Sequence, residues 1–176
     1  MARAALLCYA RSVRSLYDVP PVILLQPSAL LPLLPPQSRL LGLDAGEKTI
    51  GVALSDSLRT IATPLLTLSR TKFLKDAEKL KALTDKHEVG ALVLGFPLNM
   101  DGTTGPRAQS VRTLAGSLQR HIALPLLLWD ERMSTMAAER VIQEASLSRG
   151  KRDAVVDKLA AAYILQGALD ALNALT

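Results

Sequence analysis

Cysteine, aromatic residues and uninterrupted hydrophobic runs are all scarce in this chain of 176 residues. The single cysteine, Cys8, excludes an internal disulfide framework and suits a reducing compartment. Aromatic residues make up only 3%, so the core must be built from aliphatic side chains. No apolar run reaches the roughly 18 residues that a membrane-spanning helix needs, and prolines interrupt the richest run, PPVILLQPSALLPLLPP. We therefore expect one cytoplasmic domain with an aliphatic core and no membrane association.

Net charge is also small, with a formal value of +5. Residues 1–40 contain four arginines and one aspartate, so they carry +3 of this charge, and the rest of the chain carries only +2. Such a balance is compatible with a polyanionic partner but does not require one. A nucleic-acid site would need basic groups that the fold gathers locally.

Residues 1–38 differ in composition from the rest of the chain. They are rich in Pro, Arg and Leu, poor in acids, and show no sustained hydrophobic period. Three interpretations are open: a disordered extension, a targeting segment, or a spurious extension from an upstream start codon. Residues 39–176 are expected to form the folded domain.

Hydrophobic patterning from residue 39 onward predicts an α/β fold. Strands at 40–45, 49–55 and 60–69 are joined by short connections and should form an antiparallel meander. Two later strands are separated by helices and should run parallel through crossover connections. The chain is therefore expected to form a mixed five-stranded sheet flanked by helices. The later strands are predicted at 90–97 and 124–131, and the helices at 71–87, 103–121, 135–147 and 153–174.

Asp44 interrupts an apolar strand within LLGLDAGEKTIGVALSD, residues 40–56. Gly42 lies on the same strand face and leaves room for something to approach the backbone, and Gly46 permits a turn. One interpretation of Asp44 is a turn aspartate that accepts backbone N–H bonds. The other is a carboxylate kept for a bound ligand.

Two more carboxylates occupy positions that a core would not favour. Glu131 follows a buried strand, where functional groups gather in sheets with crossover helices. Asp130 and Glu131 alternate in direction, so the point where strand pairing stops decides which one turns inward; a surface cluster that caps the next helix is the alternative. Asp157 heads a helix face continued by Ala160 and Ala161, which can pack closely on a sheet. A carboxylate there is costly unless paired or bound to a cation, although stabilisation by the helix dipole is a simpler explanation.

A fold that brings Asp44, Glu131 and Asp157 together has to compensate their repulsion. Two carboxylates about 4 Å apart repel by roughly 4 kcal/mol at an effective dielectric constant of about 20, so their pKa values must rise or a divalent cation must be held. The two histidines, His87 and His121, are solitary, so no zinc-type set exists. All-oxygen ligation indicates Mg²⁺ or Mn²⁺, and carboxylate-held ions suit phosphoryl transfer. We interpret the three residues as candidate metal ligands and catalytic groups.

Four stretches of the chain resemble the characteristic stretches of the YqgF/RuvX family: LLGLDAGEKTIGVALSD, LVLGFPLNMDGTTGPRAQ, DERMST and VDKLAAAYILQ. The resemblance runs from about Leu40 to Leu169. It implies an RNase H-like fold, whose element order agrees with the order predicted from patterning. It also implies a divalent-metal-dependent nuclease that hydrolyses phosphodiester bonds in the 5′-end maturation of pre-16S ribosomal RNA. Members of the family have also been described as Holliday-junction resolvases.

Carried over residue by residue, the resemblance makes Asp44 the carboxylate of the first strand, Glu131 the one after a later strand, and Asp157 the one on the last helix. The family often has a basic residue where this chain has Thr49, which leaves one phosphate contact in doubt. Lys48 remains as a cation beside the site.

Five basic residues are candidates for contact with nucleic acid. Arg107 is expected in the first turn of a helix, where the dipole favours acids, so a phosphate bound at that helix end would explain it. For each candidate the alternative is a solvated surface charge. The candidates are Lys48, Arg107, Arg132, Lys151 and Arg152.

The sequence thus favours a nuclease whose partner is precursor ribosomal RNA, with structured DNA as the alternative. A junction resolvase would share this chemistry and differ only in substrate. A non-catalytic binding module should lack one of the three carboxylates, and this chain keeps all of them. An actin-like phosphotransferase needs two lobes, which 176 residues cannot supply. We expect a monomer or a weak homodimer.

Overall fold

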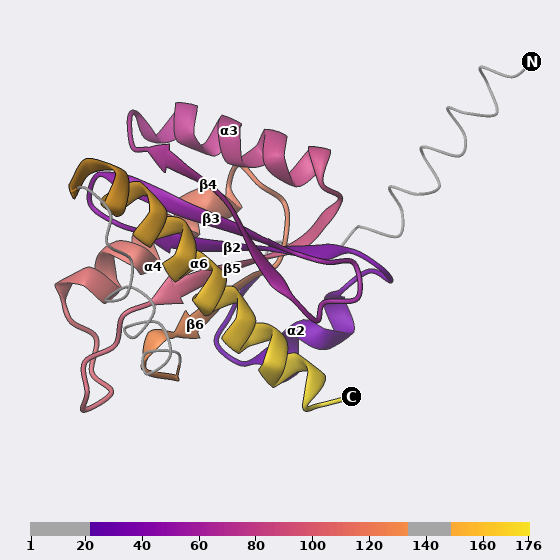
Figure 1. The fold of residues 1–176 in the computed structure, drawn as a ribbon. Coiled ribbons are helices and arrows are strands. Elements are labelled where there is room, and N and C mark those ends of the chain that lie inside the picture. The colour runs from indigo at the N-terminus through magenta and orange to yellow at the C-terminus, as the bar shows by residue number, and fades with distance from the viewer. Residues whose placement is uncertain (1–21, 134–148) are drawn as a thin grey trace, which may run out of the picture.

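The computed structural model describes residues 22–133 and 149–176. Its centre is a six-stranded mixed sheet with the strand order β1-β6-β5-β2-β3-β4 (Figure 1). The antiparallel meander and the parallel later strands are those that patterning predicts. The strands are β1 (Ile23–Leu24), β2 (Arg39–Ala45), β3 (Thr49–Ser55), β4 (Ala62–Ser69), β5 (Val89–Phe96) and β6 (Leu126–Asp130).

Helices cover both faces of the sheet, which makes three layers (Figure 1). The long helix α6 packs on one face, together with α2, while α3 and α4 pack on the other. The predicted α/β fold, a mixed sheet flanked by helices, is confirmed. The helices are α2 (Pro27–Leu30), α3 (Phe73–Lys86), α4 (Pro106–Gln119) and α6 (Arg149–Asn173), with 3₁₀ turns η1 (Leu31–Leu33) and η2 (Glu131–Met133).

The sixth strand comes from the segment that we expected to lie outside the domain. Ile23 and Leu24 of β1 pair in parallel with Leu126 and Leu127 of β6, and Leu30 in α2 is fully buried beneath α6. Burial of these aliphatic side chains offsets the entropy of ordering the segment. Disorder is therefore the wrong description for residues 22–38, while residues 1–21 lie outside the described residues.

Two differences concern the C-terminal helices. The helix predicted at 135–147 lies outside the described residues. The last helix begins at Arg149, a few residues earlier than predicted, and ends at Asn173 as expected. Within the described parts of the chain, no helix has both the length and the hydrophobicity needed to span a membrane.

Strand alternation decides which side chains of β2 face which layer. Leu41 and Leu43 pack in the core beneath α3 and α4, whereas Leu40 packs in the core beneath α6. Because successive side chains point to opposite faces, Asp44 shares the α6 side with Leu40 and Gly42. The candidate carboxylate thus lies at the C-terminal end of β2, on the face that α6 covers.

Helix α6 approaches the sheet closely at a glycine of β2. A Cβ atom on Gly42 would lie 2.6 Å from Leu165 Cβ and 2.9 Å from the carbonyl oxygen of Ala161. The room predicted at Gly42 is therefore filled by the protein's own helix rather than by a ligand. The same feature exists on β3, where a Cβ on Gly51 would overlap the backbone of Asp157.

We expect Gly42→Ala to lower the free energy of unfolding by about 1–3 kcal/mol, because the added methyl group must push α6 away from the sheet. Urea denaturation measures this difference. Gly116→Ala is the matched control, because nothing lies within 4 Å of a Cβ built on that mid-helix glycine; it should stabilise the protein by up to about 1 kcal/mol. Equal effects of the two changes would contradict the close packing.

Candidate active site

Glu131 lies over β5, next to the end of β2. Strand β6 ends at Asp130, and Glu131 begins the 3₁₀ turn η2. A Cβ on Gly95 of β5 would lie 2.6 Å from Glu131 Oε1 and 2.6 Å from Ile164 Cδ1 of α6. The missing side chain at Gly95 therefore makes the space for this carboxylate between the sheet and α6.

Asp157 reaches the site from helix α6, which covers this face of the sheet. The close approach of α6 to Gly51 fixes the height of the Asp157 backbone above β3. The Thr49 hydroxyl group, at the start of β3, donates a hydrogen bond of 2.6 Å to Asp157 Oδ2. Thr49 thus orients the Asp157 carboxylate.

Electrostatic coupling connects the three carboxylates. Burial, followed by repulsion from Asp157, raises the pKa of Asp44 to about 6. Burial, followed by repulsion from Asp44, raises the pKa of Glu131 to about 7. Asp44 is therefore the central member of the group, since Asp157 repels it and it repels Glu131. Desolvation and like-charge proximity of this kind are common at functional sites.

The site is nevertheless not a preformed cage for one ion. Among the side chains that the structure describes (residues 22–132 and 157–176), no three of Asp, Glu, His or Cys come close enough to hold a single metal ion. The coupling is pairwise, Asp44 with Asp157 and Asp44 with Glu131. The donor set still fits a hard divalent cation, because it consists of carboxylate oxygens whose repulsion such a cation would offset.

Arg107 is the predicted basic residue that the structure connects most clearly to these carboxylates. It lies in the first turn of α4, and its positive charge lowers the pKa values of both Asp44 and Glu131 against the larger raising effects. Lys48 is exposed in the turn between β2 and β3. Lys151 and Arg152 belong to the first turn of α6, but their side chains lie outside the described residues.

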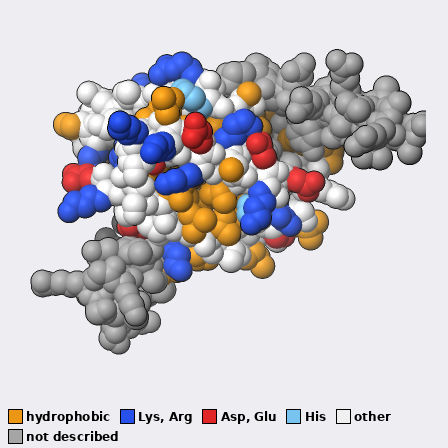
Figure 2. Space-filling view, turned by 90° about the horizontal axis from the view of Figure 1, so that it is seen from above, with side chains coloured by type: hydrophobic (Ala, Val, Ile, Leu, Met, Phe, Trp, Pro, Cys, Tyr) orange, Lys and Arg blue, Asp and Glu red, His pale blue; other side chains and the backbone are white. Residues whose placement is uncertain are grey.

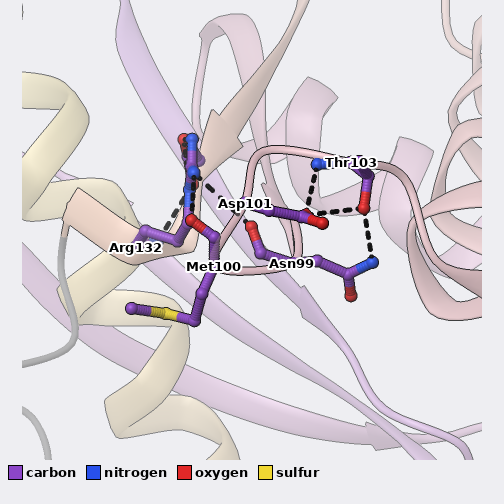
Figure 3. A network of polar contacts seen from close by, with 6 residues as sticks. Asn99, Met100, Asp101, Thr103 and Arg132 are labelled. Atoms are coloured by element: carbon purple, nitrogen blue, oxygen red, sulfur yellow. Dashed lines mark hydrogen bonds and ion pairs between the residues drawn. The ribbon is translucent and has the colours of Figure 1, made fainter.

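Arg132 is engaged within the protein (Figure 3). Its guanidinium group forms an ion pair of 2.6 Å with Asp130 and donates to the carbonyl oxygens of Asn99 and Met100. The arginine holds the pKa of Asp130 below its usual range, mainly through their hydrogen bond. Arg132 therefore ties the end of β6 to the loop between β5 and α4. It also resolves the ambiguity between the two neighbouring acids, because Asp130 turns to Arg132 and Glu131 turns to the site.

The loop that Arg132 contacts is stabilised by its own turn chemistry (Figure 3). The Thr103 hydroxyl group donates to Asp101 Oδ1 at 2.6 Å and accepts from Asn99 Nδ2 at 2.8 Å. Gly102 has a φ angle of 84°, which favours glycine. These bonds fix the loop beside the carboxylates.

Sequence reasoning did not identify two side chains at this end of the sheet. For Thr49 the sequence predicted no role, yet its hydroxyl group donates a hydrogen bond to Asp157. For Arg70 the sequence also predicted no role, although its guanidinium group donates a hydrogen bond of 2.7 Å to the carbonyl oxygen of Gly46. Strand register could have indicated the position of Arg70. Thr49 pairs with Ser69, so Arg70, the residue after Ser69, lies beside the turn between β2 and β3.

Comparison with known proteins identifies the family. A family model described as "RuvX: Holliday junction resolvase" matches residues 38–171. The chain belongs to the RuvX family. A relative from Paramagnetospirillum magneticum, named "Putative pre-16S rRNA nuclease", is 58% identical over 147 residues, which are 84% of this chain and 95% of the relative. A relative of the same name from Cereibacter sphaeroides is 57% identical over 140 residues, covering 80% and 88%.

A solved structure, T. thermophilus RuvC in complex with a Holliday junction substrate, is also similar to this RuvX-family chain. The identity is 12%, the TM-score is 0.44, and the match covers 72% of this chain and 93% of RuvC.

Asp44→Asn should stabilise the protein at about pH 8 without divalent metal, by about 2 kcal/mol. The pKa of Asp44 is raised from 3.8 to about 6 in the folded state. Between these two pH values the folded state binds more protons than the unfolded state, so the wild type loses stability as pH rises from about 4 to about 6. The gain from Asn should therefore shrink as pH falls and vanish near about pH 4.

Urea denaturation across this pH range, with EDTA present, measures the effect. Asp85→Asn is the control, because Asp85 is an exposed residue paired with Lys81 on α3; it should change stability by less than about 0.5 kcal/mol. A destabilised Asp44→Asn protein at alkaline pH would show that the carboxylate is not strained by burial.

Proposed function

We propose that this protein is a divalent-metal-dependent nuclease that hydrolyses phosphodiester bonds in precursor 16S ribosomal RNA. The observation that carries the proposal is the coupling of Asp44 to both Asp157 and Glu131 at one end of the sheet. Membership in the RuvX family and the printed names of the relatives support the nuclease class and the RNA substrate. A cytoplasmic location and a monomer or weak homodimer remain our expectations.

Asp44, Glu131 and Asp157 are the residues that would hold Mg²⁺ or Mn²⁺. Such ions, when bound, would supply an activated water molecule and charge stabilisation of the leaving oxygen. The chain itself positions the donors. Thr49 orients Asp157 by its hydrogen bond, Gly95 leaves the space for Glu131, and Arg107 offsets part of the negative charge.

The surface charge is suited to a polyanionic substrate. Figure 2 shows Lys and Arg side chains spread over the face that carries α3, around an apolar area. Lys72, Lys75 and Lys79, at the start of α3, are exposed. Contacts of this kind with phosphates carry no sequence information, but they raise affinity and make it salt-dependent. The site residues, rather than this face, would determine where the chain is cut.

A Holliday-junction resolvase is the second candidate function, favoured by the description of the family model. The same carboxylates would serve it, since the cleaved bond is again a phosphodiester. A non-catalytic module is less well supported, because all three carboxylates are retained.

Cleavage of precursor 16S RNA and of a four-way DNA junction, side by side in Mg²⁺ or Mn²⁺, tests the proposal. We expect metal-dependent cutting of the RNA and a loss of at least about a hundredfold in rate for Asp44→Asn, because the change removes a metal-binding charge and keeps the shape. Asp85→Asn should cut like the wild type.

Two results would overturn this assignment. Cutting of the junction alone would select the resolvase. Equal nucleic-acid binding by wild type and Asp44→Asn, with neither substrate cut, would make the carboxylates structural.

A further inference from the structure

A cavity of about 250 Å³ lies at the C-terminal end of β2, on the α4 side of the sheet. Its walls are the turn after β2, the residue after β4 and the first turns of α4. Ala45, which directly follows Asp44, lines it, together with Val111 and Leu114 of α4. The cavity and the carboxylates thus lie on opposite sides of the same strand end.

Two arginines from different elements line this cavity, Arg70 and Arg107. Arg70 is held in place twice by the turn after β2: its backbone N–H group donates to the Lys48 carbonyl oxygen at 2.8 Å, and its Nη1 donates to the Gly46 carbonyl oxygen at 2.7 Å. The second bond uses one of the five N–H donors of a guanidinium group and leaves others for a ligand. Arg70 is therefore a positioned cation rather than a freely moving one.

Arg107 connects the cavity to the carboxylates. The same side chain lines the cavity together with Ala45, which directly follows Asp44 on β2. A nucleic-acid strand whose scissile phosphate lies at the carboxylates would therefore bring a neighbouring phosphate to Arg107 and Arg70. Val111 and Leu114 offer an apolar wall for the attached sugar.

We propose that this cavity binds a backbone phosphate of the nucleic-acid substrate next to the bond that is cut, and that Arg70 is its main positioning residue. The proposal rests on the proposed nuclease function. Glu47 is the acid that lines the cavity, so it opposes the anion and limits affinity. Arginine suits this task because its planar donors match two phosphate oxygens at once.

Binding without cleavage separates this proposal from the nuclease assignment. The probe is a fluorescently labelled single-stranded RNA with the precursor 16S sequence, titrated in EDTA with the full chain. Arg70→Gln should weaken binding by about fivefold to tenfold and reduce the slope of log K against log salt by about 0.7. Glu47→Gln should tighten binding by about twofold to threefold, which tests the same cavity in the opposite direction.

Arg120→Gln is the charge-matched control. Arg120 lies at the opposite end of α4, roughly 20 Å away along the helix axis, and donates to the Ser117 hydroxyl group. It should leave affinity within about twofold of the wild type. Thermal denaturation of each variant shows whether the fold is kept.

A methylphosphonate placed at single linkages of the RNA identifies the ligand as phosphate. At one linkage next to the cut, loss of the charge should weaken wild-type binding as much as Arg70→Gln does, with no further loss in Arg70→Gln. In Mg²⁺ or Mn²⁺, Arg70→Gln should raise KM by a similar factor with kcat within about twofold, because its role is binding.

Equal affinities of Arg70→Gln and Arg120→Gln for RNA, or a methylphosphonate effect that is undiminished in Arg70→Gln, would overturn the cavity proposal whether or not the wild type cuts. The expected binding pattern together with no cutting in any metal would leave the cavity as a phosphate site and overturn the nuclease function instead.

Discussion

The close packing of α6 on the sheet is the constraint on which the rest of the structure depends. Gly42 and Gly51 let the helix backbone reach the strands, and the aliphatic residues Leu165 and Leu169 then close the core on that side. This contact fixes where Asp157 lies above β3. Asp44 lies on β2, next to β3. The same packing therefore also sets the distance between the Asp44 and Asp157 carboxylates and buries that of Asp44.

The electrostatics of the site follow from that packing. Burial and the neighbouring carboxylates raise the pKa values of Asp44 and Glu131 to about 6 and 7, which costs stability at neutral pH unless a cation compensates it. The chain supplies Arg107 as partial compensation. A site that remains under-compensated in this way is suited to a divalent ion and to a phosphate group brought by a substrate.

Much of the fold could be predicted from hydrophobic periods, because β2, β3, β5 and β6 are regular and their connections are short or helical. The strand β1 could not, since two residues in a proline-rich segment show no period. The position of Glu131 depends on Gly95, which belongs to a different strand, so this relation is visible only once β5 and β6 pair. The role of Arg70 likewise depended on strand register.

Crystals of the protein grown with Mn²⁺ and measured at the manganese absorption edge would test the central claim most directly. The account predicts an anomalous peak in contact with Asp44 and with Glu131 or Asp157, at the end of β2. Peaks elsewhere at saturating Mn²⁺, with the Asp44 carboxylate unligated, would contradict it.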